Sequence, residues 1–189
     1  MSKKTLPTTN TVNENEQEIE ALIESAPFPI AVYLGRDMIV ARANKAVIEV
    51  WGKGADIIGR TYKEILPELE GTGIYQKLEE VFDTGVPYHV RNSKVVLKVN
   101  GRLKEFYFNY AFTPLFNKLG KVYGVMNTAA DVTDLNQAKQ HAEFSELNFR
   151  NMILQAPVAM CLLRGPQFII DIVNEAMLDI WGKPKDDVM

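Results

Sequence analysis

A long internal repeat is the feature of this sequence that most restricts its fold. Shifting the chain by 130 positions aligns residues 21–59 with residues 151–189 without a gap, and eleven of the thirty-nine aligned pairs are identical. Chance alone gives roughly two or three identities at ordinary composition. The two tryptophans of the chain, Trp51 and Trp181, occupy the same position in the two copies. Both copies are therefore expected to adopt the same local structure.

The period of this repeat indicates whole domains, because the units of solenoid proteins are only about 20 to 50 residues long. The chain holds one full copy and the opening part of another. Residues 1–15 are polar and lack a hydrophobic period, so they are expected to form a disordered lead. We expect a domain over residues 16–133, a linker helix over 134–155, and an incomplete second domain over 156–189.

Hydrophobic patterns in the first copy predict an α+β domain. Helices are expected over residues 16–26, 44–51, 61–69 and 73–85, and strands over residues 30–34, 38–43, 87–99, 102–112 and 122–132. The dipeptide Asn100–Gly101 favours a type I′ turn, which joins two long antiparallel strands. The predicted fold is a five-stranded antiparallel sheet with its helices on one side.

The most similar part of the repeat reads as a short capped helix. Asn44 and Asn174 stand at the expected N-cap, where a side-chain oxygen accepts from free amides of the first turn. Gly52 and Gly182 follow the last helical residue and are expected to end each helix. Trp51 then lies on the apolar face of the helix. It is first a structural anchor and second a candidate for stacking on a flat ligand.

Composition excludes several classes of protein. A net charge of −3 and the lack of a basic run argue against nucleic acid as the main partner. No stretch reaches the roughly 20 apolar residues of a membrane helix, and the N-terminus lacks the apolar core of a signal peptide. The single cysteine, Cys161, excludes an intramolecular disulfide and fits a reducing compartment. We therefore expect a cytoplasmic protein.

Several motifs in this order resemble those of PAS domains. They are Ala26–Pro27 ahead of the first hairpin, the helix that opens at Asn44 and closes with "WG", the turn "TPLFNKLGKVYG" at 113–124, and "DVT" at 131–133. The resemblance covers residues 17–133 fully and 151–189 in part. The wording around "WGK" and the tandem arrangement look most like bacterial multi-sensor histidine kinases.

This resemblance implies a sensory input module of a signal-transduction protein, most like that of a two-component phosphorelay. Asp131 and Thr133 would relay the signal into the linker helix, and a kinase or another output domain would be the downstream partner. From the residues alone, Thr133 is also a plausible N-cap of that helix. PAS domains of this kind form homodimers. The expected dimer seam consists of Ile19, Leu22, Ile23, Leu135, Ala138, Ala142 and Phe149.

No enzyme is expected, because paired carboxylates, a glycine-rich phosphate loop, a Ser/His/Asp set and clustered metal ligands are all missing from the sequence. If a small molecule binds, the candidate residues are Trp51, Phe108, Tyr110, Met126 and Asn127. No cofactor is assigned. The alternatives are a cofactor-free dimerisation scaffold, or a flavin- or haem-binding redox module.

The residues speak against the redox alternative. A photoactive flavin domain of the LOV type needs a cysteine near the flavin, and residues 16–133 contain none. Phe108 and Met126 stand where such domains carry flavin-reading amides. His89 and His141 do not lie on the helix that usually supplies a haem ligand. His141 also lacks the following acid and proline of a phosphoacceptor histidine.

Overall fold

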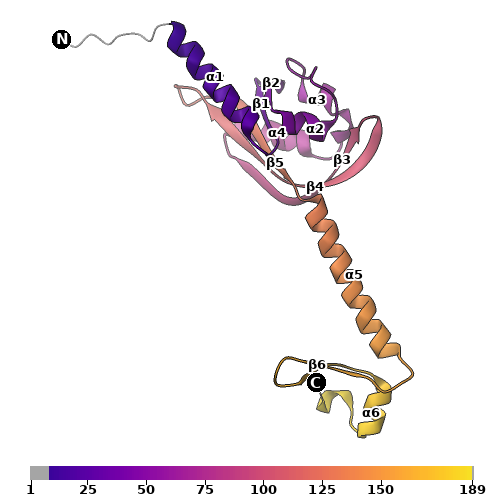
Figure 1. Cartoon of the computed structure of the whole chain (residues 1–189). Coiled ribbons are helices and arrows are strands. Elements are labelled where there is room, and N and C mark those ends of the chain that lie inside the picture. The colour runs from indigo at the N-terminus through magenta and orange to yellow at the C-terminus, as the bar shows by residue number, and fades with distance from the viewer. Residues whose placement is uncertain (1–8, 189) are drawn as a thin grey trace, which may run out of the picture. The chain divides into compact units, whose positions relative to one another are not determined.

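The computed structural model describes residues 9–188 and divides the chain into two compact units. The first unit extends to Thr133, and the second begins at Asp134 (Figure 1). The division falls where the sequence predicts the linker helix to begin.

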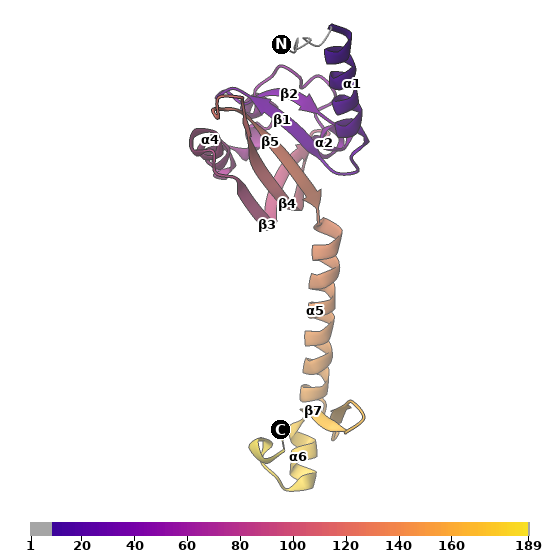
Figure 2. The ribbon, with the colours of Figure 1, turned by 90° about the vertical axis from the view of Figure 1, so that its left-hand side faces the viewer.

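The first unit is built on one antiparallel sheet, as the sequence predicts. The sheet order is β2-β1-β5-β4-β3, so the first hairpin is joined to the last strand rather than to the next one (Figure 2). The strands are β1 (Ile30–Leu34), β2 (Ile39–Ala43), β3 (Tyr88–Val99), β4 (Arg102–Phe116) and β5 (Val122–Asp131). The turn at Asn100 and Gly101 has positive φ at both residues, as a type I′ turn requires.

Short helices follow the first hairpin and cover the inner face of the sheet (Figure 1). They are α2 (Lys45–Trp51), α3 (Tyr62–Ile65), the 3₁₀ helix η1 (Pro67–Leu69) and α4 (Ile74–Thr84). The side chains of Tyr33, Val125 and Phe112 from three neighbouring strands are almost fully buried beneath them. The α+β fold class predicted from the sequence is thereby confirmed.

The N-terminal helix α1 (Thr9–Ser25) begins earlier than predicted. Residues 9–15 of the expected disordered lead are helical and continue directly into the amphipathic stretch predicted after Glu16. Residues 1–8 of the expected lead lie outside the described part of the chain.

The buried side chain of Asn44 holds three elements of the first unit together. Its Oδ1 accepts from the amide of Val47, which caps α2, and from the amide of Ile30 at the start of β1, both at 3.0 Å. Its amide nitrogen donates to the carbonyl oxygens of Ile23, Ala26 and Phe28. The predicted N-cap is confirmed, and the same residue also fixes the end of α1.

The second unit repeats this arrangement with Asn174. Its Oδ1 accepts from the amides of Met160 and Met177, and its amide nitrogen donates to the carbonyls of Ala156 and Val158. The unit comprises α5 (Thr133–Gln155), the hairpin β6 (Cys161–Arg164) and β7 (Ile169–Val173), α6 (Glu175–Trp181) and η2 (Lys185–Asp187).

The two tryptophans differ in their surroundings. Trp51 is 4% exposed and packs against the ring of Tyr62 with centroids 5.8 Å apart, whereas Trp181 is 39% exposed. Tyr62 belongs to a part of the domain that has no counterpart among the described residues of the second unit. The anchor role predicted for the repeated tryptophan is thus seen in the first unit.

Gly52 can end α2 only because it has no side chain. Its φ is +60°, and a Cβ there would stand 2.5 Å from Cγ1 of Val99 on β3. Gly182 has the same backbone conformation, with nothing within 4 Å of such a Cβ. The expected helix-ending role of both glycines is confirmed, and close packing adds a second requirement in the first unit.

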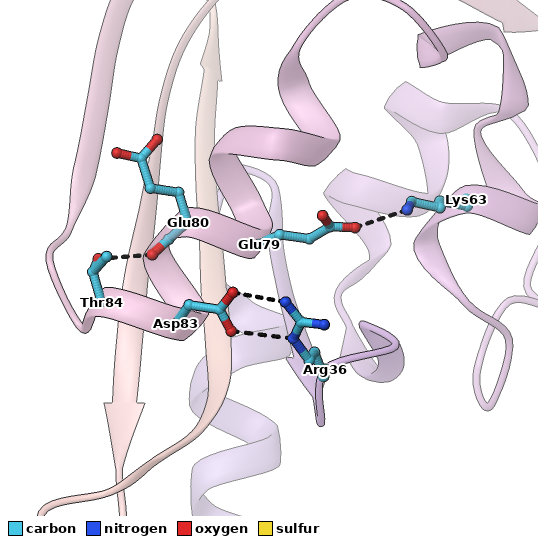
Figure 3. A network of polar contacts seen from close by, with 6 residues as sticks. All are labelled: Arg36, Lys63, Glu79, Glu80, Asp83 and Thr84. Carbon is cyan, nitrogen blue, oxygen red and sulfur yellow. Dashed lines mark hydrogen bonds and ion pairs between the residues drawn. The ribbon is translucent and has the colours of Figure 1, made fainter.

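Ion pairs attach α4 to the elements beside it, as Figure 3 shows. Arg36, in the β1–β2 turn, donates two hydrogen bonds to the carboxylate of Asp83 on α4, at 3.2 and 2.8 Å. One turn earlier, Glu79 accepts from Nζ of Lys63 on α3 at 2.7 Å. Because these side chains are largely exposed, water screens both pairs and each contributes little to stability.

A more buried ion pair joins α2 to η1 and β3. Nζ of Lys53 lies 2.7 Å from Oε1 of Glu68, and the backbone amide of Lys98 donates to the same oxygen. The two side chains are only 19% and 10% exposed. Burial raises the pKa of the Glu68 carboxyl, but the hydrogen bonds from Lys53 and Lys98 outweigh it and hold that pKa below its usual value.

Replacing Asn44 with alanine should lower the free energy of unfolding of the first unit by about 3 kcal/mol or more, because several buried backbone groups lose their partner. Urea unfolding followed by Trp51 fluorescence in a Trp181→Phe background measures this loss. Asn174→Ala is the matched control and should leave the Trp51 transition unchanged. A similar loss in both variants would contradict the local role of Asn44.

Glu68→Gln should lower the unfolding free energy at neutral pH by about 1–3 kcal/mol, since it leaves the Lys53 ammonium without its counter-ion. A carboxylate with a lowered folded pKa stabilises the fold above its unfolded pKa of about 4.3 and stops doing so as pH falls through the folded value. Urea titrations should therefore show a difference in unfolding free energy between the unmodified chain and Glu68→Gln that is constant near neutral pH and shrinks below about pH 4.

The exposed pair of Lys77 and Glu80 on α4 has the same 2.7 Å separation and supplies the control. Glu80→Gln should leave the free energy of unfolding almost unchanged, because solvent screens this pair. If the loss of unfolding free energy in Glu68→Gln were as large at the lowest pH as at neutral pH, the charge of the carboxylate would not be what stabilises the fold.

Candidate functional site

A cavity of about 50 Å³ lies in the first unit between the short helices and the inner face of the sheet. This core pocket has room for a small chemical group, since one water needs roughly 10–15 Å³ by the same kind of measure. Its walls are lined by Pro29, Val47, Val50, Trp51, Tyr62, Leu66, Leu69, Ile74, Val95, Leu97, Phe108, Tyr110, Phe112, Asn127 and Ala129.

Four of the five predicted ligand residues, Trp51, Phe108, Tyr110 and Asn127, line this pocket. Met126, the fifth, does not line it. Met126 pairs with Val32 on β1, whereas its neighbour Asn127 pairs with the buried Ala31. Because side chains alternate along a strand, Met126 and Asn127 point to opposite faces of the sheet, and only Asn127 faces the helices.

Asn127 supplies an unusual polar group to this apolar site. Its side chain is 8% exposed, and its Nδ2 donates to the hydroxyl of Tyr33 at 3.2 Å. Its Oδ1 is buried and has no hydrogen-bond partner among the described residues. A buried acceptor without a donor costs free energy, so the pocket offers a binding position for an O–H or N–H group.

The phenols around the pocket stay uncharged at physiological pH. Burial raises the pKa of Tyr33, an effect that the hydrogen bond from Asn127 partly offsets. The pKa of Tyr62 is raised well above its usual value by burial and by neighbouring phenols, and burial also raises that of Tyr110. The core pocket is therefore a neutral environment, which disfavours a charged group.

Tyr62 is a pocket residue that sequence reasoning missed. Its ring lies 5.0 Å from that of Tyr33, 5.8 Å from Trp51 and 5.7 Å from Tyr75, measured between centroids. The capping box of Thr61 and Glu64, which fixes the start of α3, places it there. The Thr-x-x-Glu spacing is visible in the sequence and could have located Tyr62 in the first turn of a buried helix.

The predicted relay residues, Asp131 and Thr133, join the end of β5 to the start of α5. Oδ1 of Asp131 accepts from both the amide and the hydroxyl of Thr133. The Thr133 oxygen accepts from the amide of Tyr107 on β4 at 2.9 Å, and the Tyr107 carbonyl accepts from Val132. Thr133 is thus not the N-cap expected from the sequence, because its hydroxyl bonds to the sheet.

Several of the predicted seam residues on α1 and α5 are exposed. Ile19, Leu22 and Leu135 are more than half exposed, and Phe149 is 49% exposed. Large apolar side chains on the surface of a helix are the usual sites of contact with another chain. Nothing in a single chain tests the dimer itself, and the seam stays a prediction together with Ile23, Ala138 and Ala142.

No metal site is found in residues 9–188, where no three His, Cys, Asp or Glu side chains gather. The same described stretch contains no helix with the length and hydropathy required to cross a bilayer. His89 lies on β3 and His141 on α5, and neither is among the residues that line the core pocket. Cys161 is a half-buried free thiol on β6.

The core pocket fits a small molecule better than a large cofactor. Pockets that hold drug-sized ligands are roughly 300–1,000 Å³, and the aromatic side chains here leave far less room. One sequence argument against flavin does not hold, because the amide of Asn127 rather than Met126 faces the pocket. The argument from size applies to both flavin and haem.

Comparison with known proteins agrees with this fold. A family model described as the PAS fold matches residues 23–137. An RNA-binding light-oxygen-voltage receptor superposes with a TM-score of 0.56 at 16% identity over 79% of this chain, which spans 42% of the receptor's length. A PAS domain of a Colwellia psychrerythraea protein gives 0.50 at 13% identity, over 64% of this chain and 98% of that domain. These identities show a shared fold and no more.

Variants of Tyr33 and Asn127 test whether the side-chain amide of Asn127 is required for the stability of the fold. Asn127→Leu alone should lower the free energy of unfolding by about 1–3 kcal/mol, because it leaves the fully buried Tyr33 hydroxyl without its partner. The double variant Tyr33→Phe/Asn127→Leu should have a free energy of unfolding, measured in urea, within about 1 kcal/mol of that of the unmodified chain. A double variant as unstable as the single one would show that the fold requires the amide.

Proposed function

The chain belongs to the PAS-fold family over residues 23–137, and on that premise we propose that it is a sensory module of a signal-transduction protein. In this role the core pocket of the first unit holds a small ligand, and the occupied state is passed to the helix that follows the sheet. The module acts by binding and carries out no catalysis of its own.

The observation that carries this proposal is the position of β5. The strand bears Asn127, whose unpartnered oxygen lines the core pocket, and ends at Asp131, which bonds to the first residue of α5. Its neighbour β4 contributes the pocket residue Phe108, next to Tyr107, whose amide and carbonyl are bonded to Thr133 and Val132. A shift of either strand on binding would therefore act on the start of α5.

We assign the module to the input region of a two-component sensor histidine kinase in the cytoplasm. The sequence repeat supports this, because residues 151–189 repeat the opening part of the first domain. A lone free cysteine fits the reducing compartment. The exposed apolar residues of α1 and α5 support a homodimer through which the signal reaches a downstream kinase.

A cofactor-free dimerisation scaffold is the second candidate. It is favoured by the small volume of the core pocket, which the rings of Trp51, Phe108 and Phe112 nearly fill. In a scaffold the dimer contact alone would carry information. A flavin- or haem-dependent redox module is less favoured, because either cofactor would require the core to open widely.

Native mass spectrometry of the full chain separates these roles, because one spectrum reports both subunit count and retained mass. A dimer that carries a defined extra mass is the expected result for a ligand sensor. A bare dimer would support the scaffold, and a bare monomer would contradict both dimer-based roles. An absorbance band of the purified protein above about 350 nm would identify a flavin or haem instead.

Thr133→Val should disconnect the sheet from α5, since valine has no oxygen to accept from the Tyr107 amide. That amide should exchange with solvent about tenfold faster, as expected for one lost hydrogen bond of about 1 kcal/mol or slightly more. Thr84→Val at the end of α4 also removes a hydroxyl hydrogen bond, the one to the Glu80 carbonyl, and is the control. Unchanged Tyr107 exchange in Thr133→Val would refute the coupling.

A further inference from the structure

A second, larger cavity adjoins the core pocket. Its volume is about 560 Å³, and Pro29 and Val50 line both it and the core pocket. This outer cavity lies between the loop before β1, the helix α2 and the ends of β4 and β5. The ring of Phe28, which is 43% exposed, forms part of its wall. The two cavities therefore lie next to each other, a small apolar one and a larger one that charged side chains also line.

From this adjacency we propose that the two cavities join into a single elongated ligand site when the ligand binds. Its ligand is a small aromatic amine that places a hydroxyl beside Asn127 in the core pocket and a protonated amine in the outer cavity. This inference rests on the proposed sensory function and adds the chemical class of the ligand.

The inner end of the ligand must donate a hydrogen bond. Oδ1 of Asn127 can only accept, and it is buried without a partner in the described structure. The surrounding phenols have raised pKa values and stay neutral, so the inner group should be uncharged as well. A phenolic or alcoholic hydroxyl meets both conditions.

The body of the ligand should be a flat ring, because aromatic side chains line both cavities. Phe106 lines the outer cavity and Phe108 the core pocket, and their rings are stacked with centroids 5.6 Å apart. Trp51 and Tyr110 complete the inner wall. Such surfaces bury a ligand ring well and favour offset or edge contacts with it.

The outer end of the ligand should be positively charged. Three charged residues line the outer cavity, and two of them, Glu49 and Asp131, are acids against one base, Lys104. An ammonium group would meet two opposite charges and the faces of Phe28 and Phe106, which also attract cations. A carboxylate would meet two like charges, so the site distinguishes amines from acids.

The length of the site also fits an elongated molecule. Asn127 and Asp131 stand on the same face of β5 four residues apart, which places their Cα atoms about 13 Å from each other. Asp131 is the residue that bonds to the start of α5. A ligand that spans the site would therefore touch the group through which the helix is attached to the sheet.

Calorimetric titration of the full chain with three matched probes tests the proposal. Tyramine carries both the hydroxyl and the amine, phenethylamine lacks the hydroxyl, and 3-(4-hydroxyphenyl)propionate replaces the amine by an acid. Tyramine should bind about fivefold or more tightly than the acid and about fivefold to tenfold more tightly than phenethylamine. In Tyr33→Phe/Asn127→Leu, tyramine and phenethylamine should bind alike.

Charge variants locate the outer end of the ligand. Glu49→Gln should weaken tyramine about two- to fivefold and strengthen the acid, and Lys104→Gln should do the reverse. Glu80→Gln on α4, which does not line either cavity, is the control and should change neither affinity.

Two results would overturn the inference. One is equal affinity for tyramine and the acid that neither Glu49→Gln nor Lys104→Gln alters, which would remove the outer cavity from the site while leaving a ligand in the core pocket. The other is an absence of binding by all three probes at millimolar concentration. Neither result bears on the sensory role, which native mass spectrometry of the full chain tests separately.

Discussion

The first unit depends on one buried amide. Asn44 uses both ends of its side chain, so that a single residue stops α1, starts β1 and caps α2. No other residue type of this size offers two donors and two acceptor lone pairs at once. Once these three backbone segments are fixed, α2 can lie only across the inner face of the sheet. Gly52, at its other end, then lets it approach β3 closely.

The position of α2 determines the character of the site. Trp51 reaches the sheet from this helix and forms a cluster with Tyr62, which narrows the interior to a small neutral pocket. One polar group remains in this pocket, the side-chain oxygen of Asn127, and this residue lies on β5, the strand that leads to α5. A molecule small enough to enter would meet a strand whose far end is bonded to a helix. Recognition and output thus share one element of secondary structure.

The sequence predicts this architecture well where local chemistry decides it. The Asn caps, the glycine ends and the Asn100–Gly101 turn all depend on neighbouring residues, and all are seen in the structure. The differences concern partners distant in the chain. The face on which Met126 lies depends on the pairing of β5 with β1, and the hydrogen bond of the Thr133 oxygen depends on Tyr107, which lies 26 residues away.

The hydrogen-bonding arrangement that Asn44 and Asn174 share has a consequence for the evolution of such proteins. Asn174 binds the segment after α5 as Asn44 binds the segment after α1, and Ile153 stands where Ile23 does. Each joint between a helix and the hairpin that follows it is therefore fixed by the same hydrogen-bonding pattern, supplied by an asparagine of the repeat itself. Duplication of the segment copies the joint together with the helix, which lets a chain gain further copies without inventing a new connection.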